Sequence, residues 1–136
     1  MNDRVKLLVL VSGGGTNLQA LIDAEGAGRL GPARIAAVIS DKPGVPALKR
    51  AEDAGIPALT EEPDRALPKP ERRGELSDRI LRRAGEWGAD LVVLAGFLSI
   101  LEGKIIGEYS GRIINLHPSL LPKFGGEGMY GGRVHR

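Results

Sequence analysis

The sequence contains no cysteine, and aromatic residues make up only 4% of its 136 residues. The lack of cysteine excludes disulfides and thiolate metal sites within this sequence and is compatible with a reducing compartment. With so few aromatic side chains, the core must be built from Leu, Ile, Val and Ala. No apolar run approaches the roughly 18 residues that span a bilayer, and no small-residue cleavage site follows the first apolar run. We therefore expect a cytoplasmic protein that acts without a membrane.

A large excess of charge of one sign is also lacking. The 19 Lys and Arg residues nearly balance the 17 Asp and Glu residues, giving a formal net charge of +2, and the two signs are mixed along the chain. This distribution does not call for a nucleic-acid partner. The length suits one domain with a substantial core, so we expect residues 1–136 to form a single domain.

Patterns typical of strands and helices alternate along the chain. Apolar runs that suit strands of a buried parallel sheet occur at residues 5–11, 35–39, 56–59, 91–95 and 113–114. Helical patterns, with apolar residues on one face, lie between them at residues 16–26, 45–52, 76–87 and 105–109. The alternation predicts an α/β fold with an open, mostly parallel sheet, flanking helices and right-handed crossovers.

The stretch before the third helical pattern is rich in proline and charge. Residues 61–73 contain three prolines, so we expect a surface loop beside a site. In the helix that follows, Arg79, Arg82 and Arg83 lie opposite the apolar positions. The simplest interpretation of these arginines is a solvated helix face.

A glycine-rich turn, Ser12-Gly-Gly-Gly-Thr-Asn17, joins the first strand to a helix. Glycines let the backbone approach an anion, and the free N–H groups of the helix N-terminus then hold it; Thr16 or Asn17 can cap this helix. The turn lacks the Gly-Lys-Ser/Thr of a P-loop, and Leu18 stands where a dinucleotide fingerprint has its third glycine. Asp41 follows the turn at a greater distance than the ribose-binding acid of that fingerprint. The pattern therefore favours a mononucleotide phosphate, with an ordinary strand-to-helix turn as the alternative.

The last apolar run leads into Asn115-Leu116-His117-Pro118. Residues two apart share one face of a strand, and Pro118 ends the ladder because it has no N–H. Asn115 and His117 therefore point the same way at the carboxyl edge of the predicted sheet, where ligands bind in open α/β folds. An amide and an imidazolium can both donate to an oxygen that gains negative charge, and imidazole can move a proton near neutral pH. The alternative is a satisfied structural histidine beside a turn-forming asparagine.

The run Asn115-x-His-Pro-Ser-Leu-Leu-Pro-Lys resembles the signature of the phosphoribosylglycinamide formyltransferases, a branch of the folate-dependent formyltransferase family. The resemblance implies a Rossmann-like fold and transfer of a formyl group from 10-formyltetrahydrofolate to the amine of glycinamide ribonucleotide, in purine synthesis. Asn115 and His117 would stabilise the oxyanion, His117 would shuttle protons to the folate nitrogen, and Pro118 would lie in the substrate site. The resemblance implies no metal or redox cofactor.

The glycine turn is similar to the N-terminal turn of the same family, which binds the substrate phosphate. The resemblance gives this role to Gly15, Thr16 and Asn17. It also implies that Leu121–Pro122 forms a turn with a cis peptide bond.

The segment Ala95-Gly-Phe-Leu-Ser-Ile-Leu101 resembles a family segment whose backbone binds the pterin of the folate. The folate-binding positions implied are Phe97, Leu98, Ser99, Ile100 and Leu101. Leu98 and Ser99 replace a Met and an Arg of the family pattern. Arg73 matches a family arginine that meets the folate tail. From the residues alone, Phe97 and Leu98 would simply cover the core.

Members of this family continue for several elements beyond the position of His135, which lies in the loop that follows their site. The resemblance therefore implies that C-terminal elements of the fold, including an aspartate near the histidine, are missing here. We accordingly expect this chain alone to be at best a poor catalyst. Two alternatives stay open: a related formyltetrahydrofolate-dependent transferase or hydrolase, and a non-catalytic mononucleotide-binding fragment.

Overall fold

The structure is a computed structural model that describes residues 4–116. Within these residues, the strands are β1 (Val5–Val11), β2 (Ala33–Ser40), β3 (Ala58–Thr60), β4 (Leu91–Leu94) and β5 (Ile113–Asn115). The helices are α1 (Thr16–Gly26), α2 (Pro46–Asp53), α3 (Lys69–Trp87) and α4 (Lys104–Glu108). The strands form one sheet in the order β3-β2-β1-β4-β5, and every neighbouring pair is parallel. The predicted α/β fold with an open parallel sheet is confirmed.

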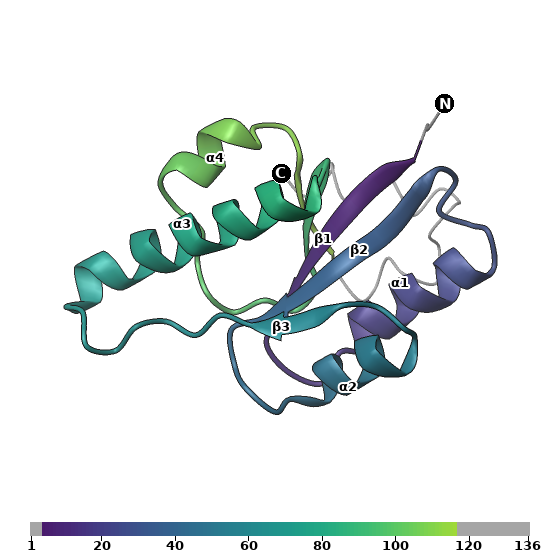
Figure 1. The fold of residues 1–136 in the computed structure, drawn as a ribbon, viewed down its shortest axis with the longest axis horizontal. Coiled ribbons are helices and arrows are strands. Elements are labelled where there is room, and N and C mark those ends of the chain that lie inside the picture. The colour runs from purple at the N-terminus through teal and green to yellow at the C-terminus, as the bar shows by residue number, and fades with distance from the viewer. Residues whose placement is uncertain (1–3, 117–136) are drawn as a thin grey trace.

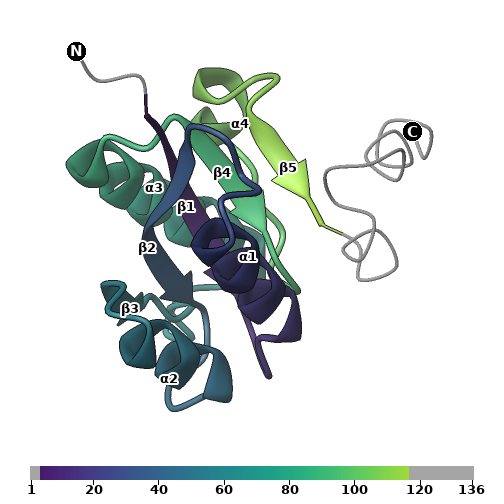
Figure 2. The ribbon, with the colours of Figure 1, turned by 90° about the vertical axis from the view of Figure 1, so that its right-hand side faces the viewer.

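The sheet is the middle of three layers (Figures 1 and 2). Helices α1 and α2 cover one face, and α3 and α4 cover the other. Strand β1 shows how the sequence produces this arrangement, because successive side chains of a strand point to opposite faces. Leu7, Val9 and Val11 pack toward α1, whereas Leu8 and Leu10 pack toward α3. A strand buried on both faces must be apolar, as the buried residues 7–11 of β1 are.

A bulge in β2 adjusts its register to this pattern. Leu7 pairs with Ile35, but Leu8 pairs with Ala37, so Ala36 is an extra residue in the ladder. The insertion reverses which face the following side chains point to. As a result Ile35 and Val38 both face the α1 side, although they are three residues apart, and Ala37 and Ile39 face the α3 side.

The strand order creates a switch point between β1 and β4. From β1 the chain proceeds outward through β2 to β3, and α3 then returns it to the other side of β1, where β4 and β5 follow. The connections after β1 and β4 therefore diverge at the carboxyl edge of the sheet. A crevice at such a point is the usual place for a ligand in an open α/β sheet.

Two local predictions about the helix N-termini were wrong. Helix α1 is capped by Gly15, with a φ of 84° and no side-chain hydrogen bond, so neither Thr16 nor Asn17 caps it. Helix α3 begins at Lys69, inside the stretch expected to be a loop, with Pro68 at its N-cap. Proline suits the first turn of a helix, whose N–H groups lack intrahelical partners, so this proline-rich stretch starts α3 and Arg73 is helical.

The expectation of a solvated arginine face was wrong for Arg79, whereas the Arg83 side chain is 41% exposed although it is ion-paired. The Arg79 side chain is only 20% exposed, and both arginines form ion pairs with Glu61, whose side chain is 11% exposed. Arg82 is exposed, as predicted. In residues 4–116, no helix combines the length and the apolar character needed to cross a bilayer. The cytoplasmic location stays a prediction.

Candidate functional site

A pocket of about 200 Å³ lies at the switch point, between the glycine turn (residues 12–17) and the segment that follows β4. All six residues of the glycine turn line it, together with Ala95, Gly96 and Leu98. We call it the glycine-turn pocket. The structure thus brings Gly15, Thr16 and Asn17, predicted to bind phosphate, to the place where the fold favours a ligand.

Helix α2 fixes the backbone of the glycine turn from outside. The Ala47 N–H donates to the Gly13 carbonyl at 3.0 Å, and Arg50 Nε donates to the Gly14 carbonyl at 2.8 Å. At Gly15 a Cβ atom would lie 2.7 Å from Ala47 Cα, and the φ of 84° also disfavours a side chain. Gly15 therefore serves the close approach of the turn to α2 as well as the pocket.

The chemistry of this pocket suits an anion. Because Gly15 supplies no side-chain cap, the first N–H groups of α1 have no partner among the described residues. These N–H groups and the positive end of the helix dipole attract negative charge. The exposed Thr16 and the largely buried Asn17 add a hydroxyl and an amide from the pocket wall. None of the lining residues carries a charge of its own.

The segment after β4 is held from beneath by two buried side chains. Leu98 N–H donates to Ser12 Oγ at 2.7 Å, and Ser99 Oγ–H donates to the Asp41 carboxylate. Ser12 follows β1 and Asp41 follows β2, and they are 3% and 4% exposed. Three adjacent strands of the sheet thus contribute to the position of one short segment.

A second pocket, of about 150 Å³, lies on the other side of Leu98. Its lining residues are Pro63, Arg72, Arg73, Leu76, Leu98, Ser99 and Ile100. We call it the Arg73 pocket. Leu98 is 73% exposed and is the residue that the two linings share, so the two pockets meet at Leu98.

The two arginines of this pocket differ in how they are used. Arg72 donates to the carbonyls of Leu67 and Arg65, at 2.8 and 3.1 Å. Arg73 is exposed and has no hydrogen-bond or ion-pair partner within residues 4–116. The Arg73 pocket therefore offers one free cation beside the apolar side chains of Leu98 and Ile100, which suits a ligand with an acidic group.

The predicted folate-binding segment is divided in the structure. Leu98, Ser99 and Ile100 line the Arg73 pocket, whereas Phe97 and Leu101 pack against the core under α3 and α4. The side chains of Phe97 and Leu101 therefore support the segment and do not line either pocket.

Asn115 ends β5 at the carboxyl edge of the sheet and is exposed. It pairs with Leu94 of β4, and the next residue continues the ladder because Leu116 N–H donates to the Leu94 carbonyl at 2.9 Å. Ala95 and Gly96, which follow Leu94, line the glycine-turn pocket. The register thus places Asn115 beside the strand end that borders this pocket.

The predictions for His117, Pro118, the Leu121–Pro122 peptide bond and His135 lie outside the described residues. Within the described residues, no group of three His, Asp or Glu side chains is placed to hold a metal ion.

Comparison with known proteins identifies the family. The family model described as Formyl transferase matches residues 5–133. The chain belongs to the formyl transferase family. A phosphoribosylglycinamide formyltransferase of Haemophilus influenzae is 42% identical over 127 residues, which cover 92% of this chain and 57% of that protein.

Solved structures of the formyl transferase family share the fold. Glycinamide ribonucleotide transformylase 1 of Symbiobacterium toebii matches with a TM-score of 0.76 and 38% identity, over 99% of this chain and 62% of that one. The corresponding protein of Geobacillus kaustophilus matches with a TM-score of 0.74 and 35% identity, over 97% and 68%. The chain therefore spans somewhat more than half the length of the first two relatives.

Sequence reasoning missed three residues that shape this candidate site. Ser12 was considered only as part of the turn, Asp41 only as a ribose-binding acid, and Arg50 not at all. Asp41 instead lies beneath Ser99, and Arg50 holds Gly14. Each contact joins residues at least 36 positions apart. No local pattern signals such contacts, although a polar residue directly after a buried strand is a reason to look for one.

Proposed function

We propose that this chain supplies the nucleotide- and folate-binding parts of a phosphoribosylglycinamide formyltransferase. Such an enzyme transfers a formyl group from 10-formyltetrahydrofolate to the amine of glycinamide ribonucleotide. The observation that carries the proposal is the pair of pockets on either side of Leu98, one with free helix N–H groups and one with a free cation. The names of the relatives support the choice of both substrates. We also propose that residues 1–136 form one domain that works in the cytoplasm.

The phosphate of glycinamide ribonucleotide would bind in the glycine-turn pocket. The N–H groups of Thr16 and Asn17 and the Thr16 hydroxyl would donate to phosphate oxygens, with Gly15 allowing the close approach. The rest of the nucleotide would then extend along the carboxyl edge toward Asn115, and Pro118 would contribute to binding this substrate.

The folate would bind in the Arg73 pocket. The backbone of Leu98, Ser99 and Ile100 would recognise the pterin, and Arg73 would pair with a carboxylate of the folate tail. Phe97 and Leu101 would contribute by anchoring this segment to the core.

In the proposed reaction the nucleotide amine attacks the formyl carbon, and the bond from that carbon to the folate nitrogen then breaks. Asn115 and His117 would donate to the oxygen that gains negative charge, and His117 would carry the proton from the amine to the leaving nitrogen. Loss of one such donor lowers turnover about 10²-fold or more. In a chain completed with the C-terminal elements of the family, Asn115→Ala should therefore slow transfer while leaving the affinity for both substrates unchanged.

Titration calorimetry with glycinamide ribonucleotide tests the phosphate assignment directly. Thr16→Val keeps the shape of the side chain but removes the hydroxyl, and should weaken binding about tenfold or more, the usual worth of a hydrogen bond to a charged group. Thr60→Val, at the end of β3, is the matched control and should bind as the parent does. Inorganic phosphate should compete with the nucleotide. A parent chain that shows no saturable, phosphate-sensitive binding would refute the proposed function.

A further inference from the structure

The β3–α3 loop (residues 61–68) forms part of the Arg73 pocket, since Pro63 is one of the lining residues. The loop contains no helix or strand, yet it is attached to α3 at both ends. Ordering a loop of this length costs conformational entropy. A loop that is already held by these attachments loses less conformational entropy when a ligand binds.

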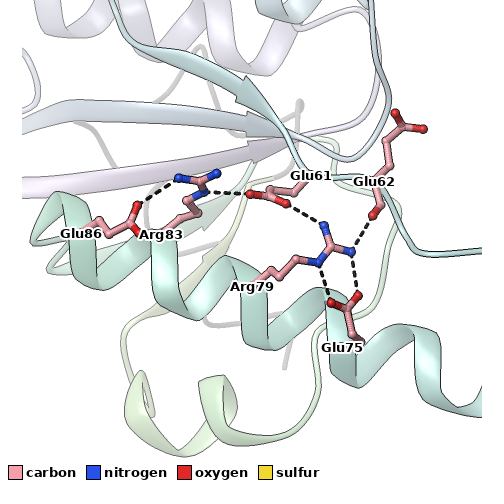
Figure 3. Close-up of polar contacts among 6 residues, drawn as sticks. All are labelled: Glu61, Glu62, Glu75, Arg79, Arg83 and Glu86. Atoms are coloured by element: carbon pink, nitrogen blue, oxygen red, sulfur yellow. Dashed lines mark hydrogen bonds and ion pairs between the residues drawn. The ribbon is translucent and has the colours of Figure 1, made fainter. Parts of the chain in front are cut away.

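At the loop entrance, the Glu61 carboxylate lies between two arginines of α3 (Figure 3). One Glu61 oxygen accepts from Arg79 Nη1 at 2.6 Å, and the other accepts from Arg83 Nε at 2.7 Å. The Glu61 N–H also continues the sheet ladder by donating to the Ser40 carbonyl at 2.8 Å. Glu61 thereby ties the end of β3 to the middle of α3.

Arg79 also holds the loop backbone directly. Its Nη2 donates to the Glu62 carbonyl at 2.6 Å, one residue before Pro63. The guanidinium is kept in this orientation by a bidentate pair with Glu75, at 2.8 Å for both bonds (Figure 3). A planar fork with all three nitrogens engaged in this way is a rigid attachment.

At the loop exit, Arg72 takes over the same role through the carbonyls of Leu67 and Arg65. The next residue, Arg73, keeps its charge free for a ligand. Neighbouring arginines of one helix are thus divided between holding the wall of the pocket and facing its interior.

We infer that Arg79, acting with Glu61, is a positioning residue for folate binding: it holds the β3–α3 loop on α3 so that the Arg73 pocket exists before the ligand arrives. This inference rests on the proposed function. Pre-organisation of this kind strengthens binding by reducing what must be ordered on association. Arg79 touches neither pocket, so its effect should be confined to the ligand that uses the β3–α3 loop.

The test compares Arg79→Ala with Arg82→Ala, an exposed arginine on the same helix, by titration with 5-formyltetrahydrofolate and with glycinamide ribonucleotide. Arg79→Ala should weaken 5-formyltetrahydrofolate about tenfold, the factor expected when the loop is in place in about a tenth of the molecules. Its affinity for glycinamide ribonucleotide should equal that of the parent. Arg79→Lys should restore binding only in part, because an ammonium cannot reproduce the bidentate fork. Arg82→Ala should match the parent for both ligands.

Hydrogen exchange of the amides in residues 61–68, measured without ligand, separates this inference from the proposed function. Faster exchange in Arg79→Ala than in Arg82→Ala would support the holding role, and equal exchange would overturn it. Parent-like folate affinity in Arg79→Ala, or equal weakening of both ligands, would also overturn it. A parent that does not bind 5-formyltetrahydrofolate would refute the proposed function, whatever the exchange result.

Discussion

The two pockets that meet at Leu98 are made in different ways. The glycine-turn pocket is made mostly of backbone, and its lining carries no charge. The Arg73 pocket is lined by residues of α3, of the β3–α3 loop and of the segment after β4, and we infer that the ion pairs of Glu61 hold its loop wall in place. In both, the backbone beside the pocket is fixed by an arginine that donates to a carbonyl: Arg50 to Gly14, and Arg79 to Glu62.

The difference lies in what each pocket tolerates. A backbone pocket is specified by a few consecutive residues and fails when a side chain is added. A side-chain pocket is specified by distant partners and fails when one partner is removed, because the remaining charge stays partly buried and unpaired. The predictions below separate these two kinds of failure, beginning with the largest expected effect.

Gly15→Ala should be the most damaging single change in the glycine turn. The added Cβ would lie within 2.9 Å of three atoms of α2, including Ala47 Cα, and the residue would keep a positive φ. Overpacking and left-handed strain together predict a loss of about 2–4 kcal/mol in the free energy of unfolding. Urea denaturation measures this loss.

Gly14→Ala is the matched control, because a Cβ there would meet no atom within 4 Å. If both variants were equally stable, the turn would not be fixed by its contact with α2. The comparison also shows that Gly15 variants cannot test ligand binding cleanly, since they disturb packing as well.

Glu61→Gln should have a smaller effect. It should lower the free energy of unfolding by about 1–3 kcal/mol at neutral pH, because charge-assisted hydrogen bonds are lost. Burial tends to raise the pKa of Glu61, but the hydrogen bonds and charges of Arg83 and Arg79 outweigh it and leave the pKa below its ordinary value. A lowered carboxyl pKa stabilises the fold above the unfolded-state pKa, about 4.3. This stabilisation is lost as the pH falls through the lower pKa of the folded state.

The difference in unfolding free energy between parent and Glu61→Gln should therefore be constant from pH 6 to 8 and shrink in acid. Glu86→Gln, which removes only an exposed partner of Arg83, is the control and should show a smaller difference. A difference that grows as the pH falls would contradict the assigned charge pair.

Asp41→Asn should have the smallest effect on stability. One carboxylate oxygen accepts from Ser99, but the other is buried and has no partner among the described residues. An asparagine keeps an acceptor for Ser99 and removes the buried charge, so stability should change by at most about 1 kcal/mol. Asp41→Ala removes the acceptor and should be clearly less stable in thermal unfolding. Equal stability of the two variants would mean that the bond to Ser99 does not fix this segment.

The same division explains what the sequence could predict. The layers of the sheet follow from the apolar run in β1, and the glycine turn is a local pattern that places its pocket as soon as the strand order is known. The register that puts Asn115 at the carboxyl edge follows from the short run before it. These features depend on neighbours in the chain, so reasoning about propensity and spacing reaches them.

The Arg79–Glu61 and Ser99–Asp41 contacts could not be predicted in this way. Their partners lie 18 and 58 positions apart, and nothing in the helical pattern of α3 distinguishes Arg79 from the exposed Arg82. The start of α3 was mistaken for a loop because prolines favour both loops and the first turn of a helix. In each case the deciding information is which elements lie side by side.

The shared position of Leu98 has a consequence for how binding in one pocket affects binding in the other. Because Leu98 lines both pockets, a ligand that moves Leu98 in one pocket should change the affinity of the other pocket for its own ligand. The change is reciprocal: whatever factor the first ligand imposes on the second, the second imposes on the first. The product of the association constants of the first and the second binding step is then the same for either order of addition. The interaction between the two ligands can therefore be measured as a single coupling free energy.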